Sequence, residues 1–237
     1  MELKIIYENN DLLAVDKPAG IIVFHEVKND GEQSQAIIDL LIEKYPKLRD
    51  VGRPLRYGIV HRLDKDTSGI LLVAKNNNAL EFLQKQFKNR EVEKKYIALT
   101  AGNIKLDTGI VETLIGRSPQ NRLKQKTFSP ISKGAGRREA VTEYKVLSRY
   151  KNFTLLEVTP KTGRKHQIRC HLAYINHPIA CDRIYGFKNQ PVPGNLKRHF
   201  LHASYLKIKL PGGEEKEFNS VLSEDLSETL ENLLEIE

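Results

Sequence analysis

One stretch, residues 59–75, limits how this chain can fold. It opens with two apolar residues, continues as a polar segment from His61 to Gly69, and ends in the aliphatic run Ile70–Ala74. A continuous β-branched and aliphatic run after a glycine predicts a buried strand. The polar segment is therefore expected to form a short connection that the core holds at both ends, and Asp64 lies within it.

Asp64 has two interpretations at this stage. Cations flank it, Arg62 and Lys65, and a carboxylate held rigidly among cations is suited to chemistry. The alternative is that Asp64 caps a turn and pairs with Arg62 at the surface. Spacing alone leaves both interpretations open.

Patterns elsewhere in the chain predict an α+β fold. Short apolar runs between turn residues predict strands, and apolar residues at helical spacing predict helices. The expected strands, besides 70–74, are 3–7, 12–16, 93–100, 140–148, 153–159 and one ending at 210; the expected helices are about 34–45, 78–90, 165–175 and 223–236. Short turns join most neighbouring strands, so we expect one mixed, mostly antiparallel central sheet flanked by helices and a basic loop arm.

Two of these helices carry more specific expectations. Asn78, with Glu81 three residues later, is expected to cap the start of the second helix. The last helix is acidic, and its leucines are expected to face inward. These are Leu226, Leu230, Leu233 and Leu234.

Positive charge is concentrated before the C-terminal segment. The net charge is +8, but residues 214–237 hold nine acids and one lysine, so the residues before them carry +16. Residues 117–138, the basic arm, hold seven basic residues and no acid, and their prolines and glycines predict a mobile loop or an extended hairpin. This asymmetry favours nucleic acid as a partner, and a solvated surface without function is the alternative.

Composition also limits the compartment and the kind of site. No apolar run approaches the roughly 18 residues of a membrane span, and the N-terminus lacks a signal-peptide pattern, so we expect a cytoplasmic protein that does not enter a membrane. The two cysteines, Cys170 and Cys181, lack Cys-x-x-Cys spacing and are expected to be buried thiols. His166 and His171 are five residues apart, and no His-Glu-x-x-His occurs, so we expect no metal site.

The segment around Asp64 resembles a known catalytic motif. Its residues His61-Arg62-Leu63-Asp64, followed by Thr67-Ser68-Gly69 and an aliphatic strand, resemble the motif of the RluA family of RNA pseudouridine synthases. Residues 7–20, 94–98, 163–185 and 199–204 resemble further parts of that family in the same order. The resemblance implies the pseudouridine synthase fold, with RNA held across a central cleft. It also implies a single catalytic domain over residues 1–237, in the form without the N-terminal S4 RNA-binding domain.

The resemblance implies roles for individual residues. Asp64 is the catalytic carboxylate, Arg169 pairs with it and keeps it ionised, and Tyr96 stacks on the displaced uracil and takes part in proton transfer. Forming pseudouridine breaks the C1′–N1 bond and joins C5 to C1′, an isomerisation that needs no organic cofactor or metal. Whether Asp64 acts at C1′, at the base or on a sugar proton stays open.

RNA binding is expected from cations beside Asp64 and from cations just before Arg169. The target base must leave its stack, at a cost of a few kcal/mol, and Arg62 is expected to occupy the vacated space. Arg164, Lys165 and His166, at the start of the predicted third helix, are expected to hold phosphates together with the basic arm. The expected partner is ribosomal or transfer RNA, bound by a monomer without an obligate protein partner. The target RNA and uridine stay open.

Two rival functions and two departures from the family pattern remain. A non-catalytic RNA-binding protein would keep the charge but tolerate loss of Asp64. A glycoside or nucleotide hydrolase would need a second carboxylate across the bond, and Asp66 lies only two residues away.

Asn176 and Cys181 stand where glycine is common; asparagine accepts left-handed geometry, whereas the sequence offers no explanation for Cys181.

Overall fold

The chain folds into two compact units. The computed structural model describes residues 3–25, 35–121, 124–132, 134–194 and 196–234. The first unit comprises Met1–Lys94 and Ala203–Ser223, and the second comprises Lys95–His202 and Glu224–Glu237. The expectation of one catalytic domain over residues 1–237 stays a prediction, because compactness alone does not define a catalytic domain.

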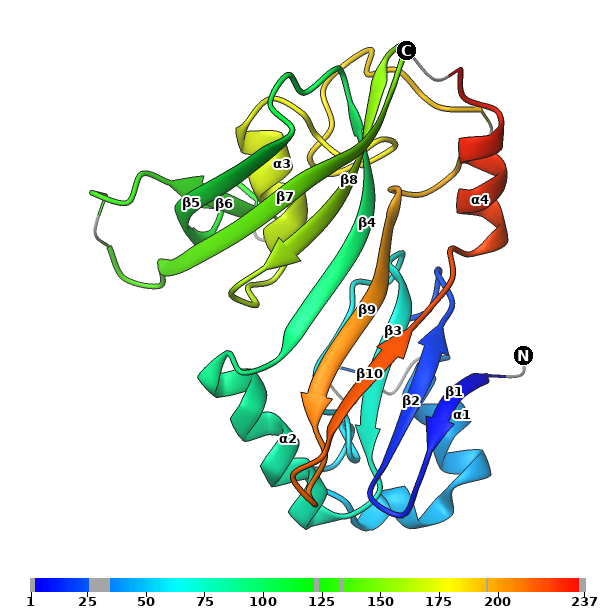
Figure 1. Ribbon diagram of the computed structural model, residues 1–237. Coiled ribbons are helices and arrows are strands. Elements are labelled where there is room, and N and C mark those ends of the chain that lie inside the picture. Colours follow the sequence, from blue (N-terminus) through cyan, green and yellow to red (C-terminus); the bar gives the residue numbers. More distant parts are fainter. Residues whose placement is uncertain (1–2, 26–34, 122–123, 133, 195, 235–237) are drawn as a thin grey trace. The chain divides into compact units, whose positions relative to one another are not determined.

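The first unit holds a mixed, mostly antiparallel sheet (Figure 1). Its strands are β1 (Lys4–Glu8), β2 (Leu12–Lys17), β3 (Ser68–Ala74), β9 (Leu201–Lys209) and β10 (Glu215–Asn219). They are ordered β1-β2-β3-β9, with β10 paired to β9. The helices of this unit are α1 (Ile37–Lys44) and α2 (Asn77–Asn89), with a 3-10 helix at Pro46–Asp50.

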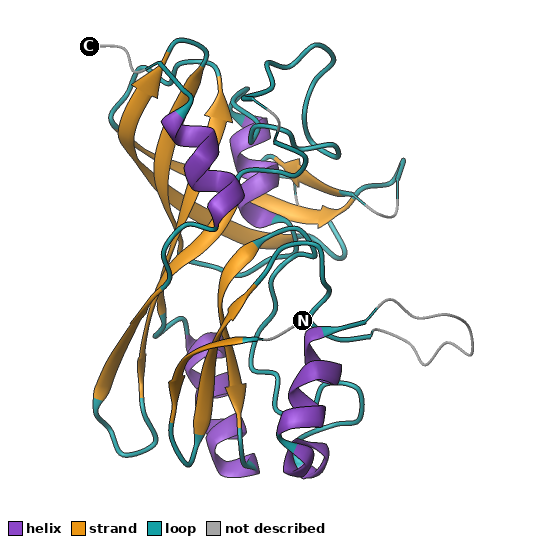
Figure 2. Cartoon of the chain, turned by 90° about the vertical axis from the view of Figure 1, so that its right-hand side faces the viewer, coloured by secondary structure: helices purple, strands orange, loops and turns teal. Residues whose placement is uncertain are grey.

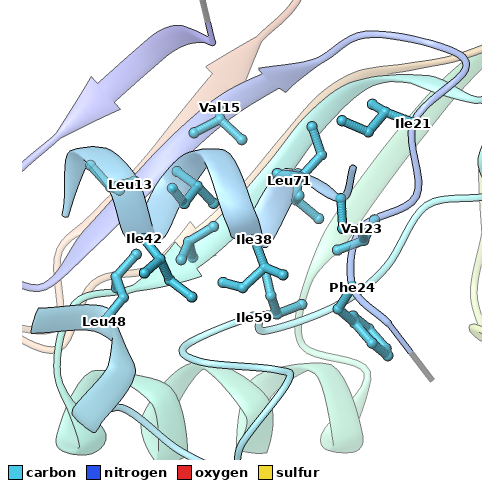
Figure 3. Close-up of a cluster of buried hydrophobic side chains, with 14 of the residues drawn as sticks. Leu13, Val15, Ile21, Val23, Phe24, Ile38, Ile42, Leu48, Ile59 and Leu71 are labelled. Carbon is cyan, nitrogen blue, oxygen red and sulfur yellow. The ribbon is translucent and has the colours of Figure 1, made fainter. Parts of the chain in front are cut away.

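Strand β3 is buried along its whole length because side chains cover both faces of this sheet. On one face Leu71 packs with Leu13 of β2 and Ile38 of α1 (Figure 3). On the other face Leu72 packs with Leu83 of α2. The buried strand predicted from the run 70–74 is confirmed, and covering on both sides explains why its sequence is continuously apolar.

Helix α2 begins earlier in the sequence than its predicted cap suggests. The side chain of Asn76 accepts a hydrogen bond from the Ala79 N–H at 2.9 Å, so Asn76 is the N-cap. The prediction that Asn78 caps this helix is wrong, because Asn78 already lies inside it. Helix α1 begins at Ile37, slightly after its expected start near residue 34, which lies outside the described residues.

The second unit also holds an antiparallel sheet. Its strands are β4 (Glu93–Ala101), β5 (Thr108–Arg117), β6 (Gln125–Phe128), β7 (Arg138–Tyr150) and β8 (Phe153–Pro160), ordered β4-β8-β7-β5-β6. Its helices are α3 (Gln167–Tyr174) and α4 (Glu224–Glu231). In both units strands make up most of the regular structure and the helices are short (Figure 2). The predicted α+β class with mostly antiparallel strands is confirmed.

The basic arm contains one short strand, β6, and its other described residues from 118 to 137 lie outside helices and strands. Strand β6 pairs with the end of β5, from Leu114 opposite Phe128 to Arg117 opposite Gln125. Two of the seven basic residues of the arm, Arg122 and Lys133, lie outside the described residues. The arm is thus built onto the sheet of the second unit.

The C-terminal helix is shorter than predicted. Leu226 is fully buried, as expected, but α4 ends at Glu231 and Leu234 is 78% exposed. The prediction that Leu234 faces inward is wrong, because the chain has left the helix before it reaches that residue. Within the described ranges, none of the helices combines the length and apolarity that crossing a bilayer requires.

Gly69 allows β3 and β9 to approach closely. Its φ is +111°, a conformation that side chains disfavour, and a Cβ at this position would collide with the backbone of Ala203. Glycine is therefore required for two separate reasons, conformation and space. This explains the glycine that follows Thr67 and Ser68 in the sequence.

We expect Gly69→Ala to lower the free energy of unfolding by about 3 kcal/mol, because overpacking adds to backbone strain. Gly213→Ala is the matched control in the same unit, since Gly213 has φ +89° but a Cβ at that position would meet nothing within 4 Å. It should cost only about 1 kcal/mol. Urea unfolding measures both, and equal losses would contradict the role of close approach.

Candidate active site

Asp64 lies in a short, hydrogen-bonded connection that leads into β3. The Thr67 N–H donates to the Asp64 carbonyl at 3.1 Å, which closes a turn. The Gly20 N–H donates to the Lys65 carbonyl at 3.0 Å and ties this turn to the chain after β2. Asp64 is half-buried, so these bonds hold its backbone while the residue remains partly accessible to solvent.

A fully buried ammonium group fixes the same turn. Lys17, at the end of β2, is 0% exposed. Its Nζ donates to the carbonyls of Lys65 at 3.0 Å, Thr67 at 2.9 Å and Pro18 at 2.7 Å. An ammonium has three donors, and burying it is tolerable only when they are satisfied. Lys17 therefore clamps the connection on both sides of Asp66.

His61 supports β3 and carries no charge. The Leu72 N–H donates to its Nε2 at 3.1 Å, and its ring stacks on Phe87 with centroids 4.7 Å apart. Burial, and to a smaller extent the positive charge of Lys94, lowers the pKa of His61 to about 3. The imidazole is therefore neutral at physiological pH and acts as a hydrogen-bond acceptor for the backbone.

Arg62 is exposed, and its guanidinium carbon lies 5.2 Å from the centre of the Phe24 ring. A cation over an aromatic face is held in place without losing its charge. Asp64 and Arg62 both belong to the first unit.

Tyr96 lies in β4, in the second unit. It is opposite Val158 of β8 and is half-buried. Its neighbour Lys95 forms an ion pair with Glu157 at 3.4 Å. The sheet thus gives Tyr96 a fixed backbone position while leaving part of its side chain accessible.

Arg169, in α3, forms a buried two-point ion pair with Asp182. Its Nε donates to Oδ2 at 2.7 Å and its Nη2 to Oδ1 at 2.9 Å, and the two side chains are 5% and 0% exposed. Burial alone would raise the pKa of Asp182, but the hydrogen bonds and charge of Arg169, with the N–H groups of Tyr185 and Ile184, hold that pKa below its ordinary value. The carboxylate is therefore ionised and orients the guanidinium.

Tyr185 joins α3 to the basic arm. Its hydroxyl accepts from the Gln125 N–H of β6 at 2.8 Å and lies 2.8 Å from Nδ1 of His166. The guanidinium of Arg169 lies 5.2 Å from the ring centre. Burial raises the pKa of Tyr185 far above its ordinary value, so the phenol stays protonated. One tyrosine thus holds together two predicted site residues and the arm.

The start of α3 is fixed by Gln167. Its Oε1 accepts from the Arg164 N–H at 3.0 Å and from the Thr162 hydroxyl at 2.7 Å. The Nε of Arg164 donates to the Glu139 carbonyl at 2.9 Å, whereas Lys165 is exposed. Arg164, Lys165 and His166 therefore surround one helix end, as the sequence predicted.

Within the described residues no group of three or more His, Cys, Asp or Glu side chains is arranged to hold a metal ion. His171 is fully buried between the hydroxyls of Thr142, at 2.8 Å, and Thr113, at 3.0 Å. Burial lowers its pKa to about 4. His171 is a neutral link between α3 and the sheet.

The backbone explains both departures from the family pattern. Asn176 has φ +64° and Cys181 has φ +60°, so each adopts the left-handed geometry for which glycine is common. Cys181 is only partly buried, which corrects the expectation that both thiols are buried. Its strained position directly precedes Asp182.

The structure brings together Arg169, His166 and, through Tyr185, the arm, all within the second unit. The predicted pairing of Arg169 with Asp64 stays a prediction. Sequence reasoning missed Lys17, Asp182 and Tyr185. In the sequence, Lys17 could have been noticed because it directly precedes Pro18. Asp182 and Tyr185 could have been noticed because they lie in the one loop that follows α3.

Comparisons with known proteins all indicate the same family. The family described as RNA pseudouridylate synthase matches residues 11–174. A protein of Aquifex aeolicus named "Uncharacterized RNA pseudouridine synthase" is 43% identical over 82% of this chain, and the "Ribosomal large subunit pseudouridine synthase D" of Borreliella burgdorferi is 38% identical over 94%. The chain spans 59% and 65% of the lengths of these two relatives.

Among solved structures, "Human RNA Pseudouridylate Synthase Domain Containing 1" is similar over 99% of this chain and 89% of its own, with a TM-score of 0.78 and 25% identity. The similarity covers the segments that contain Asp64, Tyr96 and Arg169.

We expect Lys17→Met to lower the free energy of unfolding by about 3 kcal/mol or more, because three carbonyls, one of them in a fully buried hydrogen bond, lose their donor. Lys75→Met is the control: Lys75 also donates to a carbonyl, of Asn9 at 2.7 Å, and pairs with Glu8, but it is 24% exposed. That variant should lose less than about 1 kcal/mol. Similar losses in urea unfolding would show that the Lys17 clamp adds little.

The Arg169–Asp182 pair predicts a pH-dependent stability. Because the folded-state pKa of Asp182 lies below its unfolded value of 3.8, its stabilisation is complete above that value and is lost as pH falls through the folded-state pKa. At neutral pH, Asp182→Asn should lose about 3 kcal/mol. Its deficit relative to the wild type should shrink below about pH 4, as measured by urea unfolding across pH.

Asp225→Asn is the matched control for this pair. Arg198 binds Asp225 with the same two-point geometry, at 2.6 and 2.9 Å, but the Asp225 side chain is 48% exposed. The loss should therefore stay below about 1 kcal/mol at every pH. A deficit of Asp182→Asn that persists unchanged in acid would contradict the assignment.

Proposed function

Because this chain belongs to the RNA pseudouridylate synthase family, which matches residues 11–174, we propose that it isomerises specific uridines in structured RNA to pseudouridine. The family predicted from the sequence motifs is confirmed by this match and by its named relatives. The observation that carries the proposal is the Asp64 connection. It lies within the matched residues and is held rigidly by Lys17 and Gly20.

The proposed reaction breaks the C1′–N1 glycosidic bond, turns the base and forms a C5–C1′ bond. N1 gains a proton and C5 loses one to solvent, so the reaction needs no co-reactant. Cleavage develops positive charge at the sugar, which a carboxylate can stabilise or trap. We assign this role to Asp64, whose side chain is accessible on a fixed backbone.

Arg169 and Tyr96 complete the proposed catalytic set. Arg169 supplies a guanidinium whose orientation is set by Asp182, and its role is to keep Asp64 ionised. Tyr96 stacks on the displaced uracil and takes part in proton transfer at C5. No organic cofactor or metal takes part.

RNA binding rests on charge presented by ordered elements. The exposed cations Arg62 and Lys165 have access to a large ligand. Arg62 is proposed to fill the space of the flipped base, while Arg164, Lys165 and His166 hold phosphates with the arm. Tyr185 supports this role, because it binds both His166 and the arm strand β6.

The proposed substrate is ribosomal or transfer RNA. Relatives named for the large ribosomal subunit favour ribosomal RNA. The protein is proposed to act in the cytoplasm as a monomer without an obligate protein partner. RNA of this kind offers loops whose bases can be unstacked for recognition.

The decisive experiment uses RNA labelled with tritium at uridine C5. Transcripts of large-subunit ribosomal RNA and of transfer RNA form its two arms, and at least one should release tritium to water in the presence of a chelator. Asp64→Asn should abolish release, a loss of at least about 10³-fold, because the reacting carboxylate is gone. RNA binding, measured by filter retention, should stay within twofold.

Asp66→Asn is the neighbouring control and should retain activity. Turnover by Asp64→Asn would overturn the assignment of the carboxylate. Release of free uracil would indicate hydrolysis, and RNA binding without tritium release from any transcript would favour a non-catalytic protein.

A further inference from the structure

Arg56 and Arg62 share one aromatic ring. The guanidinium carbon of Arg56 lies 4.6 Å from the centre of the Phe24 ring, and that of Arg62 lies 5.2 Å from it. Phe24 is only 6% exposed and is packed into the core, whereas both arginines are exposed. A buried ring thus holds two guanidinium groups at the surface of the first unit.

Stacking leaves the hydrogen-bonding capacity of Arg56 available. Among the described residues, the side chain of Arg56 takes part in no hydrogen bond or ion pair, and its contact is the Phe24 ring. A guanidinium that stacks through its face keeps its N–H groups directed outward, in a geometry that matches two phosphate oxygens. Two cations held at one ring repel each other, and a bound anion relieves that repulsion.

The backbone around Arg56 is held in a costly conformation. Its neighbours Leu55 and Tyr57 have φ of +69° and +31°, and left-handed geometry is unfavourable for both residue types. The N–H groups of Arg56 and Tyr57 both donate to the Arg53 carbonyl at 3.1 Å, and the Ile59 N–H donates to the Arg56 carbonyl at 2.9 Å. Strain that the surrounding structure maintains is concentrated at functional segments.

This turn is also tied to the strand that follows Asp64. The Ala74 N–H of β3 donates to the Gly58 carbonyl at 2.8 Å. A Cβ at Gly58 would collide with the Ala74 carbonyl, so only glycine permits this approach. Arg56, Arg62 and Asp64 are therefore all carried by segments anchored to β3.

We infer that Arg56 is a further RNA-binding residue, which holds a backbone phosphate next to the target uridine, beside the Arg62 that fills the space of the flipped base. Phe24 is the positioning residue that orients both guanidinium groups. The inference rests on the proposed function and adds to it a phosphate site on the Asp64 side of the substrate. The arm and the start of α3 belong to the second unit.

The test compares Arg56→Ala with Arg49→Ala, which removes the same charge from another exposed position of the first unit. With the RNA that the wild type modifies, Arg56→Ala should raise KM by about tenfold and leave kcat within twofold, because a phosphate contact acts on binding. The slope of log Kd against log salt should fall by about one. Arg49→Ala should leave both quantities unchanged.

Two further substitutions test the role of the ring. Arg56→Lys should recover only part of the affinity, because lysine keeps the charge but neither stacks nor binds in two-point geometry. Phe24→Leu keeps an apolar side chain in the core and should raise KM in the same direction. Adding Phe24→Leu to Arg56→Ala should cost less than the two single effects combined, because the pair acts as a unit. Thermal melting confirms that each variant is folded.

The outcomes separate this inference from the proposed function. If the wild type releases tritium and Arg56→Ala behaves like Arg49→Ala, the inference fails and the proposed function stands. A loss of affinity with an unchanged salt slope would assign Arg56 to a base and overturn the phosphate site. If the wild type releases no tritium from any transcript, the proposed function fails, and with it the placement of this site beside a target uridine.

Discussion

The buried ammonium of Lys17 is the constraint on which the Asp64 segment depends. A charge removed from water destabilises a protein unless polar groups replace its hydration. Here three backbone carbonyls do so, from residues 18, 65 and 67. Because all three carbonyls must point at the same nitrogen atom, their hydrogen bonds restrict the backbone around them. The end of β2 and the turn before β3 are thereby fixed to each other, and Asp64 directly precedes the first of the two fixed turn carbonyls.

The rigid turn also matters for the proposed chemistry of Asp64. A catalytic carboxylate has to be held within a fraction of an ångström of its productive position, yet it must remain accessible to a large substrate. Backbone carbonyls orient Lys17 without carrying a full negative charge, so the turn is held in place and the ammonium of Lys17 adds positive potential beside it. Gly69 serves the same end by geometry, because it lets β3 approach β9 without an intervening side chain.

The sequence predicted well those features that depend on local pattern. The buried run at 70–74 and the amphipathic helices follow from periodicity. Strands β5 and β10 were not predicted, because β5 exposes Ile110 and buries Thr113, and β10 buries only Phe218 among polar neighbours. The site residues came from motif resemblance. Lys17 was missed because lysine is rarely buried, and two of its three partners lie about fifty residues away.

Cations in this protein are oriented by three different kinds of partner. Carbonyls hold Lys17, an aromatic ring holds Arg56, and a carboxylate holds Arg169. Of these three partners only the carboxylate of Asp182 cancels the charge, and it does so for a guanidinium that is 5% exposed. At the surface, a ring orients a guanidinium while preserving its attraction for phosphate. The uncharged partner of Arg56 therefore leaves that cation available to RNA, whereas the carbonyls around Lys17 use its charge to organise the fold.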